Sequence, residues 1–247
     1  MVDAWMPGAR RIPAQTDGGM LRGGAPRVVW QALSADPGRI SACSAAQRLG
    51  QEDRAPHVVW NPISGEMAQL IPIVRAGCSL GGPEGLDYQR DGRAQHADSN
   101  NQGRLCVQIS VVAWPWEPFT DGPMNGLEPI LDWLDCWKVP CRWPAGPPAA
   151  FVHARAVPCS RAAWATGGHY GASQVPGCDA TGPGSIDIDL IGGPFETHHA
   201  PVPPQRREAP AAEVSRDSRV ALETMLAPEI AAVLAVLVAG PVPRLSP

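Results

Sequence analysis

The sequence predicts an α/β domain with a central mixed β-sheet flanked by helices, followed by a C-terminal tail. Short apolar runs typical of buried strands alternate along the chain with segments whose apolar residues recur at helical spacing. Residues 105–112 are β-branched and apolar on both faces, which indicates a central strand. From about Gly193 the composition shifts to Pro, Arg and Glu, so we expect the folded domain to end there.

The first half of the chain predicts an arm, a strand, a helix and a hairpin. Residues 5–26 are rich in Gly, Pro and Arg and predict an extended arm laid on the domain. Residues 27–30 predict a short buried strand, and helical spacing over 40–49 predicts a helix. Two apolar runs within 58–71 flank a turn and predict a β-hairpin.

The second half predicts a long loop, a helix and a tail. Residues 81–103 are polar and Gly-rich, and predict a loop near a binding face. Residues 127–138 predict an amphipathic helix whose apolar face carries Leu127, Ile130, Leu131, Leu134 and Trp137. We therefore expect a domain over 1–193 that ends with an element at 185–191, a Pro-rich linker over 194–214, and a tail over 215–247 that can form a helix.

Composition excludes several classes of protein. A net charge of −4 argues against a nucleic-acid binder held by phosphate contacts. The seven cysteines contain no C-x-x-C pair, which argues against a zinc ribbon or a thioredoxin-like redox site. No apolar run is long enough to predict a transmembrane segment. Residues 1–13 lack the apolar stretch of a secretory signal, so we expect a cytoplasmic protein or one released to the cell wall by a phage.

Residues 167–188 carry a resemblance to a known family. They contain Gly171-Ala172-Ser173, then Pro176-Gly177, then Gly182-Pro183-Gly184. This frame resembles the C-terminal signature loop of the zinc-dependent N-acetylmuramoyl-L-alanine amidases, which reads Gly-His-Ser, Pro-Gly and Asp-Pro-Gly. The resemblance covers about residues 1–193 and implies the type 2 amidase fold, which peptidoglycan recognition proteins share.

The resemblance also implies where a catalytic centre would lie. In that family two His and one Asp or Cys hold a zinc ion that activates water, and a Glu on the central strand assists. Here the ligand positions are Gln31, Ala172 and Gly182, and the Glu position is Ser110. No catalytic residue, metal ligand or cofactor is therefore expected at these positions.

Three functions remain open at this stage. The first is a bacterial or phage, endolysin-like pseudoenzyme that binds peptidoglycan or muramyl peptides. The second is an active amidase that cleaves the MurNAc–L-Ala bond through an atypical zinc site, for which His169 and Cys178 are the candidate ligands because imidazole and thiolate suit zinc. The alternative to that site is that His169 is a loop residue and Cys178 a bystander thiol. The third function is that of a prophage or genomic relic without a biochemical role, which the substitution of all four family positions favours.

The expected binding cleft depends mainly on aromatic residues. The chain has nine Trp, and an indole offers a sugar or a peptide a broad apolar face with one donor. The binding residues that we expect from the resemblance are Trp30, His57, Trp60, Tyr88 and Trp114.

Overall fold

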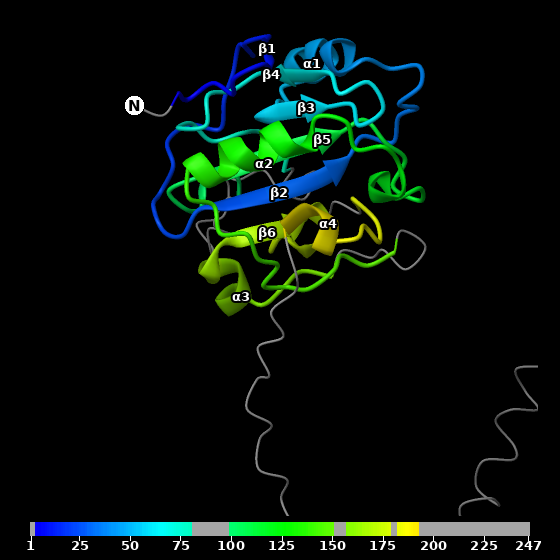
Figure 1. Ribbon diagram of the computed structural model, residues 1–247. Coiled ribbons are helices and arrows are strands. Elements are labelled where there is room, and N and C mark those ends of the chain that lie inside the picture. Colours follow the sequence, from blue (N-terminus) through cyan, green and yellow to red (C-terminus); the bar gives the residue numbers. More distant parts are fainter. Residues whose placement is uncertain (1–2, 81–98, 151–156, 179–181, 193–247) are drawn as a thin grey trace, which may run out of the picture. The chain divides into compact units, whose positions relative to one another are not determined.

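The computed structural model describes residues 3–80, 99–150, 157–178 and 182–192. They form a six-stranded sheet in the order β1-β4-β3-β5-β2-β6, shown in Figure 1. The strands are β1 (Arg10–Arg11), β2 (Arg27–Ala32), β3 (Val58–Trp60), β4 (Met67–Gln69), β5 (Cys106–Val111) and β6 (Gly168–Gly171). The helices are α1 (Ala42–Gln51), α2 (Leu127–Cys136), α3 (Arg161–Thr166) and α4 (Asp189–Gly192).

The sheet is mixed, as predicted. Strands β3 and β4 form the predicted antiparallel hairpin, and the other neighbouring strands run parallel. Strand β5 pairs with β2 on one side and β3 on the other, and all six of its residues are buried. The prediction of a central strand is therefore confirmed, because β5 has a neighbour on each side and is buried on both faces.

Helices cover the two faces of this sheet. In Figure 1, α2 crosses in front of β5 and β2, and its Ile130 and Leu134 pack in one cluster with Trp30 and Trp60. Helix α1 packs against β3 and β4 in a second cluster, and Trp164 of α3 joins a third with Val29 of β2. Since Val29 and Trp30 alternate along β2, α3 lies on the face opposite α2. We call these the α2 face and the α3 face.

The helix boundaries differ slightly from the prediction because local caps decide them. Helix α1 begins two residues late, since the Ser41 hydroxyl accepts the Ser44 N–H at 3.0 Å. Glu66 of the hairpin turn adds a bond to the Ala42 N–H at 2.7 Å. Helix α2 ends at Cys136, and Lys138 takes a left-handed conformation with φ 57°.

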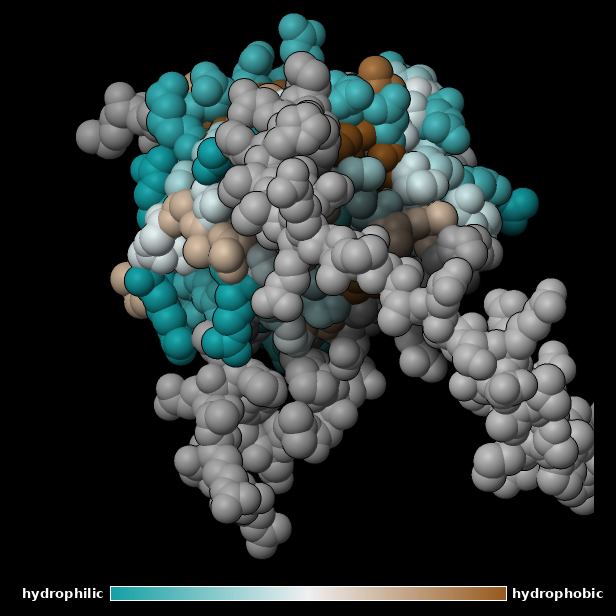
Figure 2. Space-filling view, turned by 90° about the horizontal axis from the view of Figure 1, so that it is seen from below, coloured by the Kyte–Doolittle hydropathy of each residue, from teal (hydrophilic) through white to brown (hydrophobic). Residues whose placement is uncertain are grey.

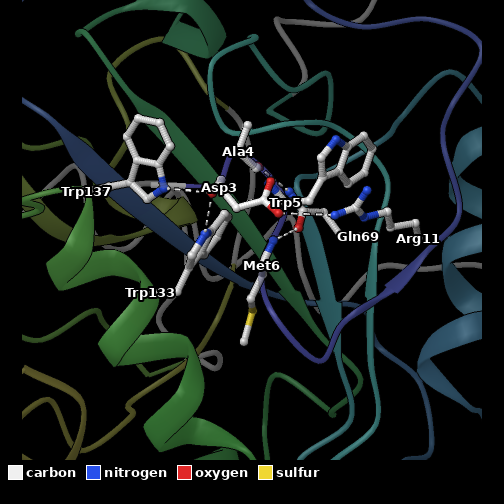
Figure 3. Close-up of polar contacts among 8 residues, drawn as sticks. All are labelled: Asp3, Ala4, Trp5, Met6, Arg11, Gln69, Trp133 and Trp137. Atoms are coloured by element: carbon white, nitrogen blue, oxygen red, sulfur yellow. Dashed lines mark hydrogen bonds and ion pairs between the residues drawn. The ribbon is translucent and has the colours of Figure 1, made fainter. Parts of the chain in front are cut away.

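The N-terminal arm lies on the domain, as Figure 3 shows. Two indole N–H groups of α2 donate to the Asp3 carbonyl, from Trp133 at 3.4 Å and from Trp137 at 3.3 Å. The Gln69 side chain donates to the Ala4 carbonyl at 3.1 Å. The arm continues into β1, a short edge strand that the sequence analysis did not predict.

Strand β6 corrects the prediction that residues 167–188 begin as a loop. Residues Gly168–Gly171 pair with β2 although they lack a β-branched pattern. Glycine is required there by close packing: the Gly168 α-carbon lies against the Arg142 carbonyl, and that of Gly171 against Pro148 and Pro183. Helix α3, which begins where Ser160 caps the Ala163 N–H, was not predicted either.

Other sequence predictions lie outside the described residues, namely most of the 81–103 loop, the linker and the tail. Within the part of the chain that is described, no helix is long and apolar enough to span a membrane. Seen from the β6 edge in Figure 2, hydrophilic residues outline much of the described surface, and hydrophobic residues form small separate groups.

Candidate functional site

Four positions distant in sequence meet at the carboxyl ends of β2, β5 and β6. Gln31 of β2 pairs in register with Ser110 of β5. Trp30 pairs with Gly171, the last residue of β6, so Ala172 follows at the level of Gln31. Gly182 is held beside them, because the Ser173 N–H donates to its carbonyl at 2.8 Å and a Cβ on Gly182 would lie 3.2 Å from the Ala32 nitrogen.

Three of these positions share the α3 face. Gln31 is two residues from Val29, and Ser110 pairs with Gln31, so strand alternation places both side chains on that face. Ala172 packs in the same cluster as Val29. A site built from these residues therefore lies on the face opposite α2.

The Gln31 carboxamide belongs to a chain of neutral hydrogen bonds. It donates to the Ser79 hydroxyl, which in turn donates to Gln108 Oε1 at 2.8 Å. Gln108 Nε2 donates to Asn100 Oδ1 at 2.8 Å. Asn100 closes the chain with Leu80, accepting its N–H at 3.2 Å and donating to its carbonyl at 2.8 Å. We call this the amide chain; it fastens residues 79–80 and 100 to the end of β2 and the middle of β5.

Two serine hydroxyls near this junction are buried without using their hydrogen-bonding capacity. Ser110 is 0% exposed and Ser173 is 2% exposed. Neither Oγ atom has a hydrogen-bond partner among the described residues. Leaving a buried hydroxyl unpaired costs about 1–3 kcal/mol, so such groups need an explanation. Both hydroxyls can donate to and accept from a polar ligand.

The residues at this junction do not fit a zinc ion. Zinc in proteins is held by imidazole, thiolate or carboxylate groups, whereas these positions offer a carboxamide, a hydroxyl and no further side-chain donor. The Gln31 nitrogen is already a donor to Ser79. Across the described ranges, no group of three His, Cys, Asp or Glu residues is close enough to hold a metal.

The structure does not bring His169 and Cys178 together. His169 is on the α2 face, where its Nδ1 accepts the Trp30 indole N–H at 3.2 Å. Burial lowers the pKa of His169 to about 3, so the ring is neutral at pH 7. Cys178 packs with Val29 and Trp164 on the α3 face. The sheet itself separates the two side chains.

Three of the expected cleft residues are in the core instead. Trp30 and Trp60 are both 0% exposed and meet edge to face, with ring centroids 6.4 Å apart. His57 is equally buried: its Nδ1 accepts the Gln108 N–H at 3.0 Å, and its Nε2 donates to the Arg75 carbonyl at 2.9 Å. Burial lowers the pKa of His57 to about 4. All three residues lie in or next to short apolar runs, which are typical of buried strands. The family resemblance had instead indicated that they bind a ligand in a cleft.

Trp114 does lie near the surface. Its ring stacks on that of Trp116, with centroids 4.7 Å apart, and Trp116 is 51% exposed. The Gly184 α-carbon lies against the Pro115 carbonyl, which places this Trp pair beside residues 182–184. Tyr88, the remaining expected binding residue, is outside the described residues.

Sequence reasoning missed Ser79, Asn100 and Gln108 as residues of this region. Gln108 is a polar residue in a mainly apolar strand, and that interruption was the available signal. Ser79 precedes the predicted loop over 81–103 and Asn100 lies within it, and neither carried a signal of its own.

The observed sheet and helices define the class of the protein, an α/β domain with a mixed sheet flanked by helices. No protein-family model matches the chain, and no curated protein sequence matches it. Among solved structures, the chain is similar to the endolysin N-acetylmuramoyl-L-alanine amidase LysCS from Clostridium intestinale URNW, with 10% identity, a TM-score of 0.41, and coverage of 76% of this chain and 95% of that one. It is also similar to a selenomethionine derivative of AmpD, with 16% identity, a TM-score of 0.31, and coverage of 56% and 75%. Similarity this distant adds nothing to the functional argument, which depends on the residues themselves.

Proposed function

We propose that this domain binds muramyl peptides of peptidoglycan at the carboxyl ends of β2, β5 and β6, and does not hydrolyse them. The observation that carries the proposal is the meeting of Gln31, Ser110, Ala172 and Gly182 at one place. The sequence resemblance selected these positions one by one, from three separate stretches, with Ala172 and Gly182 both in the signature segment 167–188. A wrong alignment would have no reason to select residues that converge in space.

The chemistry of the junction supports binding over catalysis. The Gln31 carboxamide and the hydroxyls of Ser110 and Ser173 are neutral donors and acceptors, which suit the amide and hydroxyl groups of a sugar-linked peptide. Amide hydrolysis at neutral pH requires a metal-activated water or an activated nucleophile. The amide chain contains only carboxamides, a hydroxyl and backbone groups, none of which acts as a base at pH 7.

Sedimentation with insoluble peptidoglycan tests the proposal. The full chain is expected to sediment with the wall material, to release no peptide from it, and to retain no zinc after incubation and desalting. Ser110→Ala should sediment at least several-fold less while folding normally, because it removes a hydroxyl that has no partner in the described structure. Ser44→Ala, a change of the same size at an exposed position of α1, is the matched control.

The alternatives give different results in the same assay. Zinc-dependent release of peptide by the parent chain would establish an active amidase and overturn the proposed inactivity. A parent chain that folds but stays in the supernatant would rule out peptidoglycan binding and leave the relic hypothesis.

A further inference from the structure

The start of β2 contains a buried arginine whose donors are largely unused. Arg27 is 3% exposed, and its Nη2 donates to the Ala25 carbonyl at 3.3 Å. Its Nε and Nη1 atoms are buried and have no hydrogen-bond partner in the described part of the chain. A guanidinium removed from water without partners for its N–H groups is strongly destabilising, so this arrangement requires a compensating group.

Aromatic packing compensates for only part of that cost. The guanidinium carbon lies 4.3 Å from the centroid of the Trp164 ring, in cation–π contact. The Trp164 indole offers no acceptor atom, because its Nε1 is itself a donor, to Gln102 Oε1 at 2.6 Å. The contact therefore leaves the donors on Nε and Nη1 without acceptors among the described residues.

No carboxylate in the described structure balances the charge of Arg27. The ionisable groups that face it are Cys106, Tyr170 and Cys159. Burial raises the pKa of Cys159 and of Tyr170, so both stay neutral at pH 7. The Tyr170 hydroxyl donates to the Ala163 carbonyl at 2.6 Å, and its oxygen is not a hydrogen-bond partner of Arg27 Nε or Nη1.

The segments around Arg27 are basic although the chain has a net charge of −4. Residues 20–27, 101–106 and 159–170 together contain Arg22, Arg27, Arg104 and Arg161, and no Asp or Glu. Exposed arginines around a buried one create a positive potential that attracts anions.

A glycine lies next to the Nε atom of the guanidinium. A Cβ on Gly103 would lie 3.4 Å from Arg27 Nε, and Gly103 has a positive φ of 98°. Its carbonyl accepts the Gly23 N–H at 3.1 Å, which holds this part of the backbone in place. Gly103 therefore leaves free the space that a side chain at this position would occupy next to Nε.

We propose that this arginine corner, formed by Arg27, Trp164 and Gly103, binds a single small oxyanion group, a phosphate or a carboxylate. The unpaired N–H groups of Arg27 supply charge-assisted hydrogen bonds to its oxygens, and the surrounding arginines raise its local concentration. The site lies at the opposite end of β2 from Gln31 and does not depend on the function proposed above.

Equilibrium dialysis of the full chain against radiolabelled inorganic phosphate, at constant ionic strength, tests the proposal directly. We expect about one phosphate per chain at saturation, and a midpoint of thermal unfolding that rises by about 2–4 °C, whereas chloride at equal ionic strength leaves it unchanged. An acetate arm distinguishes a carboxylate site from a phosphate site. If neither anion is retained, the proposal is overturned.

Two variants assign the binding to the buried side chain. Arg27→Met should lose the anion and the thermal shift, whereas Arg39→Met, which removes an equal charge from an exposed position beyond the carboxyl end of β2, should keep both. Equal losses in the two variants would indicate diffuse electrostatic attraction and contradict the site. If Arg27→Met does not fold, Arg27→Lys decides the question: it keeps the charge without the planar fork, and should weaken binding about tenfold or more.

Discussion

Polar side chains are buried at both ends of the parallel strands, but their hydrogen bonding differs between the two ends. At the carboxyl ends, the carboxamides of Gln31 and Gln108 are satisfied by the neutral amide chain. At the amino ends, on the same face of the same strand, the Arg27 guanidinium is buried with two of its nitrogens unpaired. The difference shows that the carboxamides can be satisfied by neighbouring strands and loops alone, although the nearby Ser110 and Ser173 hydroxyls stay unpaired among the described residues. A buried charge needs a counter-charge, which no described residue provides.

Lowering the pH should have the largest effect on the stability of the protein, because it protonates a buried histidine that is hydrogen-bonded to Gln108. His57 accepts the Gln108 N–H, and burial lowers its pKa from 6.5 to about 4. Because the unfolded state binds the proton more tightly, stability is complete above pH 6.5 and falls as the pH drops towards 4. His57 alone should remove about 3 kcal/mol of unfolding free energy over that range. Urea unfolding at pH 7 and pH 4 measures it.

Protonation of His169, whose pKa is lowered to about 3, also destabilises the folded state. The unfolding free energy of the parent should therefore fall by the sum of the two histidine contributions. A His57→Asn variant should keep only the contribution of His169. If that variant has the same pH dependence as the parent, His57 is not the group that titrates.

Gln108→Leu should have the next largest effect, because it removes the centre of the amide chain. The Ser79 N–H, the Ser79 hydroxyl and Asn100 Oδ1 would each lose one hydrogen bond, at a cost of about 2–3 kcal/mol. Gln31→Leu, at the half-buried end of the chain, should cost about 1 kcal/mol. Denaturant unfolding compares the stabilities of the two variants. A larger loss of stability in Gln31→Leu would contradict the inference that Gln108 is the centre of the amide chain and Gln31 its end.

A metal centre built at the carboxyl ends of the strands tests whether Gln31, Ala172 and Gly182 lie close enough together to hold one ion. In a Gln31→His, Ala172→His, Gly182→Asp variant, we expect about one zinc per chain by elemental analysis, and none in the parent. Ala172→His alone should cost about 1–2 kcal/mol, because Ala172 is 0% exposed and the imidazole overpacks its cluster. Zinc bound to the parent would overturn the inference that its residues do not fit the metal.

The smallest effect is expected from removing the buried charge. Arg27→Met should leave the stability unchanged or raise it by about 1 kcal/mol in buffers without oxyanions, because an unpaired buried charge is replaced by apolar volume. Arg161→Met should change it by less than about 0.5 kcal/mol. A marked loss of stability in Arg27→Met alone would indicate that the cation–π contact with Trp164 compensates more than we infer.

Elements with strong periodicity were predictable, whereas those created by pairing were not. Strand β5, the hairpin of β3 and β4, and helix α2 follow from hydrophobic patterns that depend only on neighbours along the chain. Strand β6 is glycine-rich and is a strand because β2 pairs with it and Arg142 and Pro148 approach it closely. The aromatic residues expected in a cleft show the same limit, since Trp30 and Trp60 belong to the core.

By itself the sequence determined the α/β class, the central strand, and the residue types at Gln31, Ser110, Ala172 and Gly182, since composition and period are properties of the chain alone. Only the tertiary structure decided that these positions meet, that Gln31 is fastened through Ser79 to Gln108, and that Arg27 is buried without a carboxylate from the described residues. The physical reason is that hydrogen bonding and charge compensation depend on distances between segments far apart in sequence. Those distances exist only once the sheet has formed.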